Sequence, residues 1–295
     1  MRYFDYTEVA AFLHDEELIS LLCADSGFEE LRQRFLANDF LVIDPSMKIP
    51  FFAEVRNYVG ACEKGNPGAR WVVKEITDDD GAGAAMGSLC FFLDFFTRTI
   101  SAPTVITRVG GKPCKATKVI TKAEQLSSVS YAETPQLKEQ LLLDLVNRWI
   151  YCDEDRNANN YLVRATSRGN QVVIPVDFSS VDLLFPGSKI KGRSDSFGWE
   201  RVEKARSLTP LKVEHFLGYD MGFFGQRLDA FARIGKKMLL ELARECLRFQ
   251  PDCAALARTV TDNIIKRIEY VRDYFSSQLP AGSAEKAFTK AAPNA

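Results

Sequence analysis

The sequence predicts an α+β protein of two lobes, an antiparallel β lobe that carries one helix and a mainly helical lobe after it. Three observations predict this class. Short β-branched or aromatic runs alternate with Gly and Pro turns over residues 38–125. One apolar run among them, residues 82–100, has the length of a helix. From residue 126 to 279 most apolar residues recur at helical spacing, so the chain divides into a β lobe and a helical lobe.

The β lobe is preceded by residues 1–37, which we predict to be helical because apolar residues recur there three and four positions apart. Short runs joined by turns are typical of an antiparallel sheet. The strand-like runs of the β lobe are residues 40–43, 51–59, 71–76, 104–109 and 115–120.

The helical lobe opens with a long helix whose start is marked by Thr134 and Pro135, since Thr is a good N-cap and Pro is tolerated at the first helical position. Two strand-like runs flank the turn "SRGN", residues 167–170, and predict a short hairpin. The small, polar tail at residues 280–295 is expected to be disordered. Three further helices are predicted, at residues 210–223, 226–248 and 251–277.

The composition is that of an ordinary globular protein. Of the 295 residues, 46% are hydrophobic and 26% are charged, which is enough to build a sizeable core. The formal net charge of −1 gives no reason to expect a nucleic-acid partner. No apolar run is long enough to span a membrane, and the start of the chain lacks the basic and apolar regions of a signal peptide.

The numbers of cysteines and histidines limit the kinds of catalysis that this protein can perform. Seven cysteines without a CxxC pair argue against a zinc site or a disulfide framework and favour reduced thiols. We therefore expect a cytoplasmic protein, or one exported without a cleaved signal peptide. Only two histidines are present, which nearly excludes a histidine-based triad or a multi-histidine zinc site. Any catalysis must use carboxylates, lysine, amides and bound cofactors.

Carboxylates and amides are concentrated in "YCDEDRNANNYLV", residues 151–163, between the long helix and the hairpin. Asp155 and Asn160 are five positions apart, the spacing of a kinase catalytic loop, in which the Asp accepts the hydroxyl proton and the Asn holds a metal ion. Asp177 follows an apolar strand after Asn160 and suits a principal magnesium ligand, because Mg²⁺ prefers oxygen ligands. The junction thus predicts a site for phosphoryl transfer from ATP.

Upstream, the β lobe carries residues that suit a polyphosphate. Lys74 lies in the apolar run "RWVVKEI", where a charge is costly unless it is used, and it can pair with the phosphates. Before it, residues 60–68 read as a glycine-containing loop. Gly60 and Gly65 would let backbone N–H groups approach phosphate, and Lys64 would add positive charge.

These motifs, in this order, resemble those of the atypical kinases: the HipA-like bacterial kinases and, more distantly, the phosphatidylinositol 3/4-kinases. The resemblance rests on "DRNANN", "IPVDFSSVDLLF", "WVVKEI" and "SAPTVITRV", and covers about residues 50–185. It implies a bilobal protein-kinase-like fold. It also implies an ATP- and Mg²⁺-dependent serine/threonine kinase that acts on a protein hydroxyl. The implied roles are Asp155 as catalytic base, Asn160 and Asp177 as Mg²⁺ ligands, and Lys74 with the loop at 60–68 as the ATP-phosphate site.

The sequence departs from the family pattern at three positions. Asn157 stands where a histidine is usual, and Ser179 follows the Asp-Phe pair where a glycine is common. The helix at 82–100 has no glutamate to pair with Lys74, and its only acidic residue is Asp94. Lys74 then pairs with Asp94, with Asp177 or with ATP alone; otherwise the protein is a weak enzyme or a pseudokinase.

Several alternatives stay open. Asp153 or Glu154 could serve as the base, although Asp153 places the asparagines at less suitable spacings than Asp155 does. Ser194 and Ser196, in the segment where an activation loop would lie, are candidates for autophosphorylation. The competing functions are a nucleotide-binding pseudokinase or scaffold, a kinase of a lipid or small-molecule hydroxyl, and transfer of AMP in place of phosphate. The oligomeric state is left undetermined.

Overall fold

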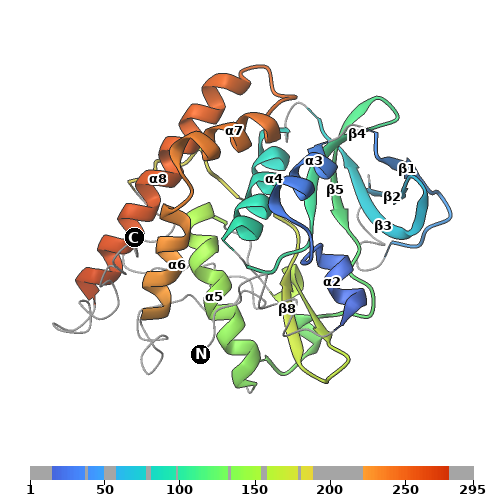
Figure 1. Ribbon diagram of the computed structural model, residues 1–295, viewed down its shortest axis with the longest axis horizontal. Coiled ribbons are helices and arrows are strands. Elements are labelled where there is room, and N and C mark those ends of the chain that lie inside the picture. The colour runs from blue at the N-terminus through green and yellow to red at the C-terminus, as the bar shows by residue number, and fades with distance from the viewer. Residues whose placement is uncertain are drawn as a thin grey trace.

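The computed structural model describes residues 15–36, 39–49, 58–77, 81–97, 99–131, 134–153, 158–178, 181–188 and 222–278. Within these ranges the predicted fold class is confirmed. An antiparallel sheet and one helix form the β lobe, and a small sheet and long helices form the rest (Figure 1). None of the helices in these ranges is both long and apolar enough to cross a membrane.

The β lobe is built on a five-stranded antiparallel sheet with the order β1-β2-β3-β5-β4. The predicted strand at 51–59 lies mostly outside the described residues, and the strand that the structure does describe begins at Tyr58. The five strands of this sheet are β1 (Leu41–Ile43), β2 (Tyr58–Glu63), β3 (Asn66–Glu75), β4 (Thr104–Val109) and β5 (Lys112–Lys118).

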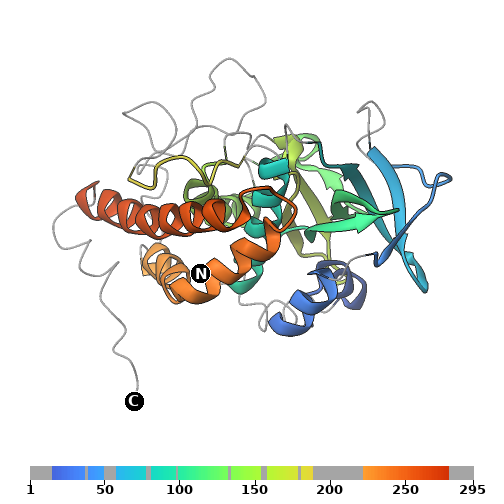
Figure 2. The same cartoon turned by 90° about the horizontal axis from the view of Figure 1, so that it is seen from above.

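Helix α4 (Gly81–Phe96) links β3 to β4 and is apolar on every side, as expected of a helix buried all round. It lies between the five-stranded sheet and the C-terminal helices (Figure 2). Phe91 and Phe92 are fully buried there. The helix ends at Phe96, before the predicted residue 100, and the backbone N–H of Thr99 donates to the Asp94 carbonyl oxygen beyond its end.

Two N-terminal helices, α2 (Glu16–Leu22) and α3 (Phe28–Leu36), pack on the β lobe. Phe35 of α3 meets the Trp71 ring edge-on, with the centroids 5.3 Å apart. Helix α2 contacts both lobes: Glu17 pairs with Lys122 after β5 and with Arg164 in the helical lobe. The described part of the predicted extension, residues 15–36, therefore packs against both lobes.

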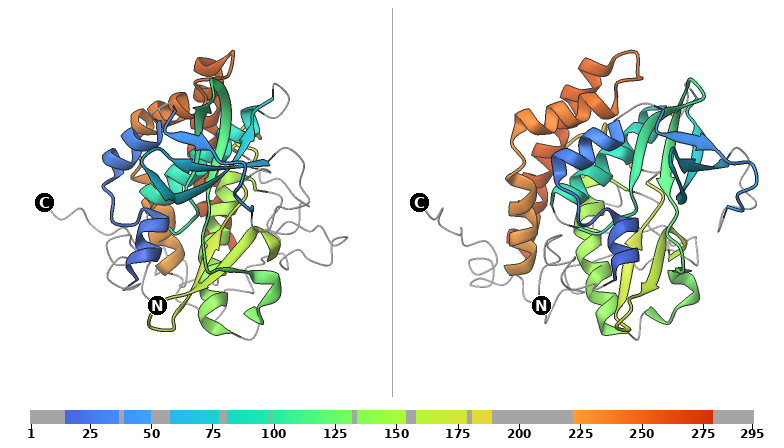
Figure 3. Two further views of the ribbon diagram at one scale, coloured as in Figure 1. Left: turned by 90° about the vertical axis from the view of Figure 1, so that its right-hand side faces the viewer. Right: turned by 45° about the vertical axis from the view of Figure 1, so that its right-hand side comes forward.

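The helical lobe begins with β6 (Glu124–Gln125) and the long helix α5 (Pro135–Tyr151). The predicted hairpin is present as β7 (Tyr161–Ala165) and β8 (Gln171–Pro175), with Gly169 at φ +79° in its turn. β6 adds a third strand that sequence analysis did not predict. The hairpin lies beside α5 and below the five-stranded sheet (Figure 3).

Three helices close the chain: α6 (Gly222–Ala232), α7 (Lys236–Cys246) and α8 (Cys253–Gln278). The prediction of one helix over 226–248 is wrong. Gly235 has an extended ψ of 145° as the N-cap of α7, and this breaks the run into two helices. The predicted helix at 210–223 lies almost wholly outside the described residues.

Candidate functional site

Asp177 lies just beyond the end of β8 in a left-handed backbone conformation, with φ +55°. Few residues other than glycine adopt this region, and Asp is among those that tolerate it best. Buried Val172 and Ile174 hold the preceding strand in the core. The position is thus rigid on its N-terminal side, and strained backbone of this kind concentrates at functional sites.

Asn160 ends the short 3₁₀ helix η3 (Ala158–Asn160) and immediately precedes β7. Its carbonyl oxygen accepts a hydrogen bond of 2.9 Å from the backbone N–H of Val176, the residue before Asp177. The antiparallel pairing of β7 with β8 therefore brings Asn160 and Asp177 to the same end of the hairpin. These two predicted metal ligands are neighbours in the structure.

Lys115, in the middle of β5, contacts Asp177. Its Nζ atom lies 3.4 Å from Asp177 Oδ1, and the residue is only 6% exposed. The contact joins the five-stranded sheet of the β lobe to the hairpin of the helical lobe. Sequence analysis missed Lys115. The sequence did offer a reason to consider Lys115, because this lysine stands between Cys114 and Ala116, and both neighbours are buried at the centre of the strand.

Lys74, the predicted phosphate-binding lysine, lies in β3 directly opposite Lys115 in the antiparallel register. Residues paired in this way point to the same face of a sheet. On its other side Lys74 pairs with Tyr58, the first residue of β2. The sheet therefore presents two lysines side by side on one face, of which Lys115 is the more deeply buried and reaches Asp177.

The prediction of a loop over residues 60–68 is wrong. Gly60 lies within β2, opposite Val72 in β3, and only Lys64 and Gly65 form the turn between the two strands. A Cβ atom at Gly60 would lie 2.6 Å from Met47 Cβ. The absence of a side chain at Gly60 therefore allows Met47 to pack closely against β2.

The turn is also far from the two lysines. Lys74 is eight positions beyond Asn66 in β3, and an extended strand rises about 3.3 Å per residue, which separates them by roughly 25 Å. Lys64 and Gly65 are thus poorly placed to cover phosphates bound beside Lys74. Gly60 lies only two positions along β2 from Tyr58, the partner of Lys74, but it is part of a strand and not of a phosphate-binding loop. Two parts of the chain lie at the Lys74 end of the sheet instead: the start of β2 at Tyr58 and the turn between β4 and β5 at Gly110 and Gly111.

Asp94, the only acidic residue of α4, is fully buried and binds α5. Its carboxylate accepts hydrogen bonds from Asn147, Arg148 and Tyr151. Of the partners left open for Lys74, Asp94 is therefore committed elsewhere. Burial raises the pKa of Asp94, and the positive charge of Arg148 opposes that increase.

The remaining predicted residues are placed only in part. Asp155 and its alternative Glu154 lie outside the described residues, as do Asn157, Ser194 and Ser196. Asp153 is fully buried where α5 ends, and it forms an isolated β-bridge with Val181, just beyond Asp177. The described residues on either side of 154–157 are therefore next to the hairpin end that carries Asn160 and Asp177.

The buried ring of Phe178 follows Asp177 and contacts both α4 and α5. Gly87 of α4 has no side chain, which allows close approach: a Cβ atom there would lie 2.8 Å from the Phe178 carbonyl oxygen. The Arg148 guanidinium of α5 lies 4.7 Å from the centre of the Phe178 ring. The backbone at Asp177 is therefore bracketed by packed elements on its C-terminal side as well.

Comparisons with known proteins add little to this geometry. No protein-family model matches the chain, and no curated protein matches it. Among solved structures, the chain is similar to the Helicobacter pylori proinflammatory kinase CtkA at 13% sequence identity, with a TM-score of 0.49. The similarity covers 82% of this chain and 98% of that one.

Proposed function

We propose that this protein transfers the γ-phosphoryl group of Mg²⁺-ATP to a hydroxyl group, as a serine/threonine protein kinase of the HipA-like type. The observation that carries the proposal is the convergence of Lys115, Asp177 and Asn160 at one place between the two lobes. A cation, a carboxylate and an amide within one site are the groups that phosphoryl transfer requires.

The residues of the site fit the implied metal and nucleotide. Asp177 supplies a carboxylate and Asn160 an amide oxygen, the hard oxygen donors that Mg²⁺ takes alongside phosphate oxygens. Lys115 and Lys74 supply two positive charges on the sheet face for the polyphosphate. Bound Mg²⁺ would neutralise phosphate charge as it develops during transfer.

In the proposed reaction the acceptor hydroxyl oxygen forms a bond to the γ-phosphorus, and the bond from that phosphorus to the β–γ bridging oxygen breaks. The hydroxyl proton passes to the carboxylate of Asp155, and ADP leaves. Lys115 and Lys74 orient the phosphates before the reaction, and Asp177 and Asn160 fix the geometry around them. Such orientation is the main protein contribution in phosphoryl transfer.

The experiment is transfer of label from γ-labelled ATP, with Mg²⁺, to the protein itself and to a mixture of proteins. Wild-type protein is compared with Asp155→Asn and Asp177→Asn, which keep side-chain size and remove charge. Asp262→Asn on α8 is the matched control, because Asp262 is exposed and forms a surface ion pair with Lys236. We expect both site variants to lose transfer while remaining folded by circular dichroism. Full transfer by both would refute the proposal.

A second candidate, a nucleotide-binding pseudokinase, is favoured by one observation. The only carboxylate of α4 is bound to α5, so that helix offers no acid to a lysine of the sheet. This candidate predicts that Mg²⁺-ATP raises the melting temperature of the wild-type protein, since a ligand that binds only the folded state stabilises it. It also predicts that no label is transferred. Using α-labelled ATP in parallel distinguishes AMP transfer, and adding lipid or small-molecule hydroxyls tests those acceptors.

A further inference from the structure

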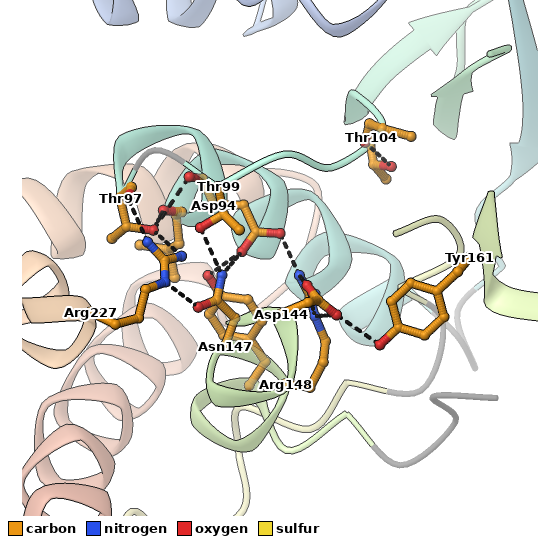
Figure 4. Close-up of polar contacts among 12 residues, drawn as sticks. Asp94, Thr97, Thr99, Thr104, Asp144, Asn147, Arg148, Tyr161 and Arg227 are labelled. Carbon is orange, nitrogen blue, oxygen red and sulfur yellow. Dashed lines mark hydrogen bonds and ion pairs between the residues drawn. The ribbon is translucent and has the colours of Figure 1, made fainter. Parts of the chain in front are cut away.

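A buried polar chain runs from Asp94 in α4 through Arg148 and Asp144 in α5 to Tyr161 at the start of β7 (Figure 4). It begins at Asp94, whose two carboxylate oxygens are both occupied by α5. Oδ1 accepts from Asn147 Nδ2 at 2.8 Å and from the Tyr151 hydroxyl at 2.8 Å, and Oδ2 accepts from Arg148 Nη2 at 2.6 Å. Three donors from one helix hold a single carboxylate of another.

Arg148 is the centre of the chain. It is fully buried between two carboxylates, with Nη2 2.6 Å from Asp94 Oδ2 and 2.7 Å from Asp144 Oδ1. Burial by itself lowers the pKa of an arginine, but the charges of Asp144 and Asp94 outweigh it, and the pKa of Arg148 is raised well above its usual value. Arg148 is therefore a permanent cation. Its flat guanidinium also packs on the ring of Phe178, 4.7 Å from the centroid.

The other end of the chain reaches the second half of the site. Asp144 Oδ2 accepts a hydrogen bond of 2.8 Å from the hydroxyl of Tyr161, which is fully buried. Tyr161 immediately follows Asn160, and Phe178 immediately follows Asp177. One connected set of charges thus contacts the residue next to each of the two proposed metal ligands.

We infer that Arg148, held by Asp94 and Asp144, is a positioning residue that sets the spacing between Asn160 and Asp177. This inference rests on the proposed function. In protein kinases a lysine–glutamate ion pair holds the corresponding helix in place. Here Arg148 of α5 holds α4 through Asp94, so the placement of α4 is set by contacts within the core.

A matched pair of variants separates positioning from simple stability. Tyr161→Phe and Tyr151→Phe each remove one buried hydroxyl that donates at 2.8 Å to a carboxylate of the chain. Only Tyr161 is adjacent to a proposed metal ligand. We expect both variants to lower the melting temperature of the nucleotide-free protein by similar amounts.

The deciding measurement is the Mg²⁺ concentration that gives half of the ATP-dependent rise in melting temperature, repeated for label transfer at a temperature where all variants are folded. Loss of a group that orients a metal ligand typically weakens metal binding about 10- to 100-fold. We expect an increase of about tenfold for Tyr161→Phe and less than about twofold for Tyr151→Phe.

A second pair keeps the test decisive if a tyrosine variant fails to fold. Arg148→Lys and Arg227→Lys each shorten a buried arginine of the network and keep its charge. Arg227 donates hydrogen bonds to Asn147 and to Thr97, and its guanidinium lies 5.2 Å from the centre of the Phe231 ring. Only Arg148→Lys should raise the Mg²⁺ requirement.

Equal Mg²⁺ requirements within both pairs would overturn the positioning inference while leaving the proposed function intact. A wild-type protein that shows neither Mg²⁺-dependent nucleotide binding nor label transfer would overturn the proposed function itself, and the inference with it. The two failures are therefore distinguished by the behaviour of the wild-type protein alone.

Discussion

Lys115 Nζ and Asp177 Oδ1 lie 3.4 Å apart, although the two residues are 62 positions apart in the chain. Lys115 belongs to the five-stranded sheet and Asp177 to the end of the hairpin in the helical lobe. Their ion pair therefore joins the lobes at the place where Asn160 also lies. Lys115 is almost fully buried, whereas about a quarter of the Asp177 side chain is exposed, at 24%. The Asp177 side chain is therefore partly accessible to solvent.

The first prediction concerns this lysine. Replacing Lys115 with Met keeps the length of the side chain and removes the charge, and should lower kcat/KM for phosphate transfer about 100-fold, as loss of one preorganised charge-stabilising group does. Lys112→Met is the control, because Lys112 is in the same strand but is exposed and pairs with Glu75. Steady-state kinetics on both variants measures the effect. Unchanged activity in Lys115→Met would show that the Lys115–Asp177 pair is structural only.

The second prediction concerns Gly87, where helix α4 meets Phe178. The added methyl group in Gly87→Ala would lie 2.8 Å from a backbone oxygen, which cannot rotate away. We expect a loss of about 1–3 kcal/mol in the free energy of unfolding, measured by urea denaturation, despite the better helix propensity of Ala. Label transfer should fall as well, because Phe178 moves with Asp177. A variant as stable as the wild-type protein would contradict the packing described here.

The third prediction concerns the N-terminal helix α2 and its contact with the helical lobe. Arg164 in β7 is 2% exposed, and its Nη2 atom lies 3.1 Å from Glu17 Oε2 and 3.8 Å from Asp15 Oδ1. In Arg164→Met we expect the free energy of unfolding to fall by about 1–3 kcal/mol, the usual range for losing a charged hydrogen-bonded partner. Limited proteolysis should then cleave α2 faster than in the wild-type protein. Arg233→Met, at an exposed position, is the control, and equal cleavage rates in the two variants would argue against this role for Arg164.

The fourth prediction concerns pH. Burial raises the pKa of the Cys246 thiol to about 12, from a usual value near 9.0, although a hydrogen bond to Ser88 opposes the increase. The folded protein therefore holds this proton more tightly than the unfolded chain does. This difference in pKa adds to the free energy of unfolding, and the full contribution is present at neutral pH. The contribution is lost as the pH rises from about 9 toward 12, by up to about 1.4 kcal/mol per pH unit.

Urea unfolding at pH 8 and pH 10 measures this effect in the wild-type protein and in Cys246→Ala. Between these pH values the wild-type protein should lose about 1 kcal/mol more stability than the variant, because only the wild-type protein carries this thiol. Other buried cysteines are present in both proteins and cancel in the difference. Identical pH dependence in the two proteins would show that Cys246 ionises as readily in the fold as in the unfolded chain.

Local sequence patterns predicted most of the fold. The Gly- and Pro-bounded runs marked strands, the unbroken apolar run marked α4, and "SRGN" marked the hairpin turn. The errors came from short-range ambiguity. Glycines at 60 and 68 looked like a loop, but strands tolerate glycine where another backbone approaches closely, as the 44–47 turn approaches Gly60.

The sequence by itself determined which residue types could perform chemistry, and it placed Asn160 just before and Asp177 just after the two strands of a predictable hairpin. Only the tertiary structure decided that Lys115 contacts Asp177 and that Asp94 binds α5. The alternation of apolar and polar residues along a strand shows which of its faces is buried. Which residue lies across that face depends on the register of the sheet and on how the lobes pack. Lys74 and Lys115 carry the same local signal of a lysine among buried neighbours, and the contact with Asp177 arises from pairing between residues far apart in the chain.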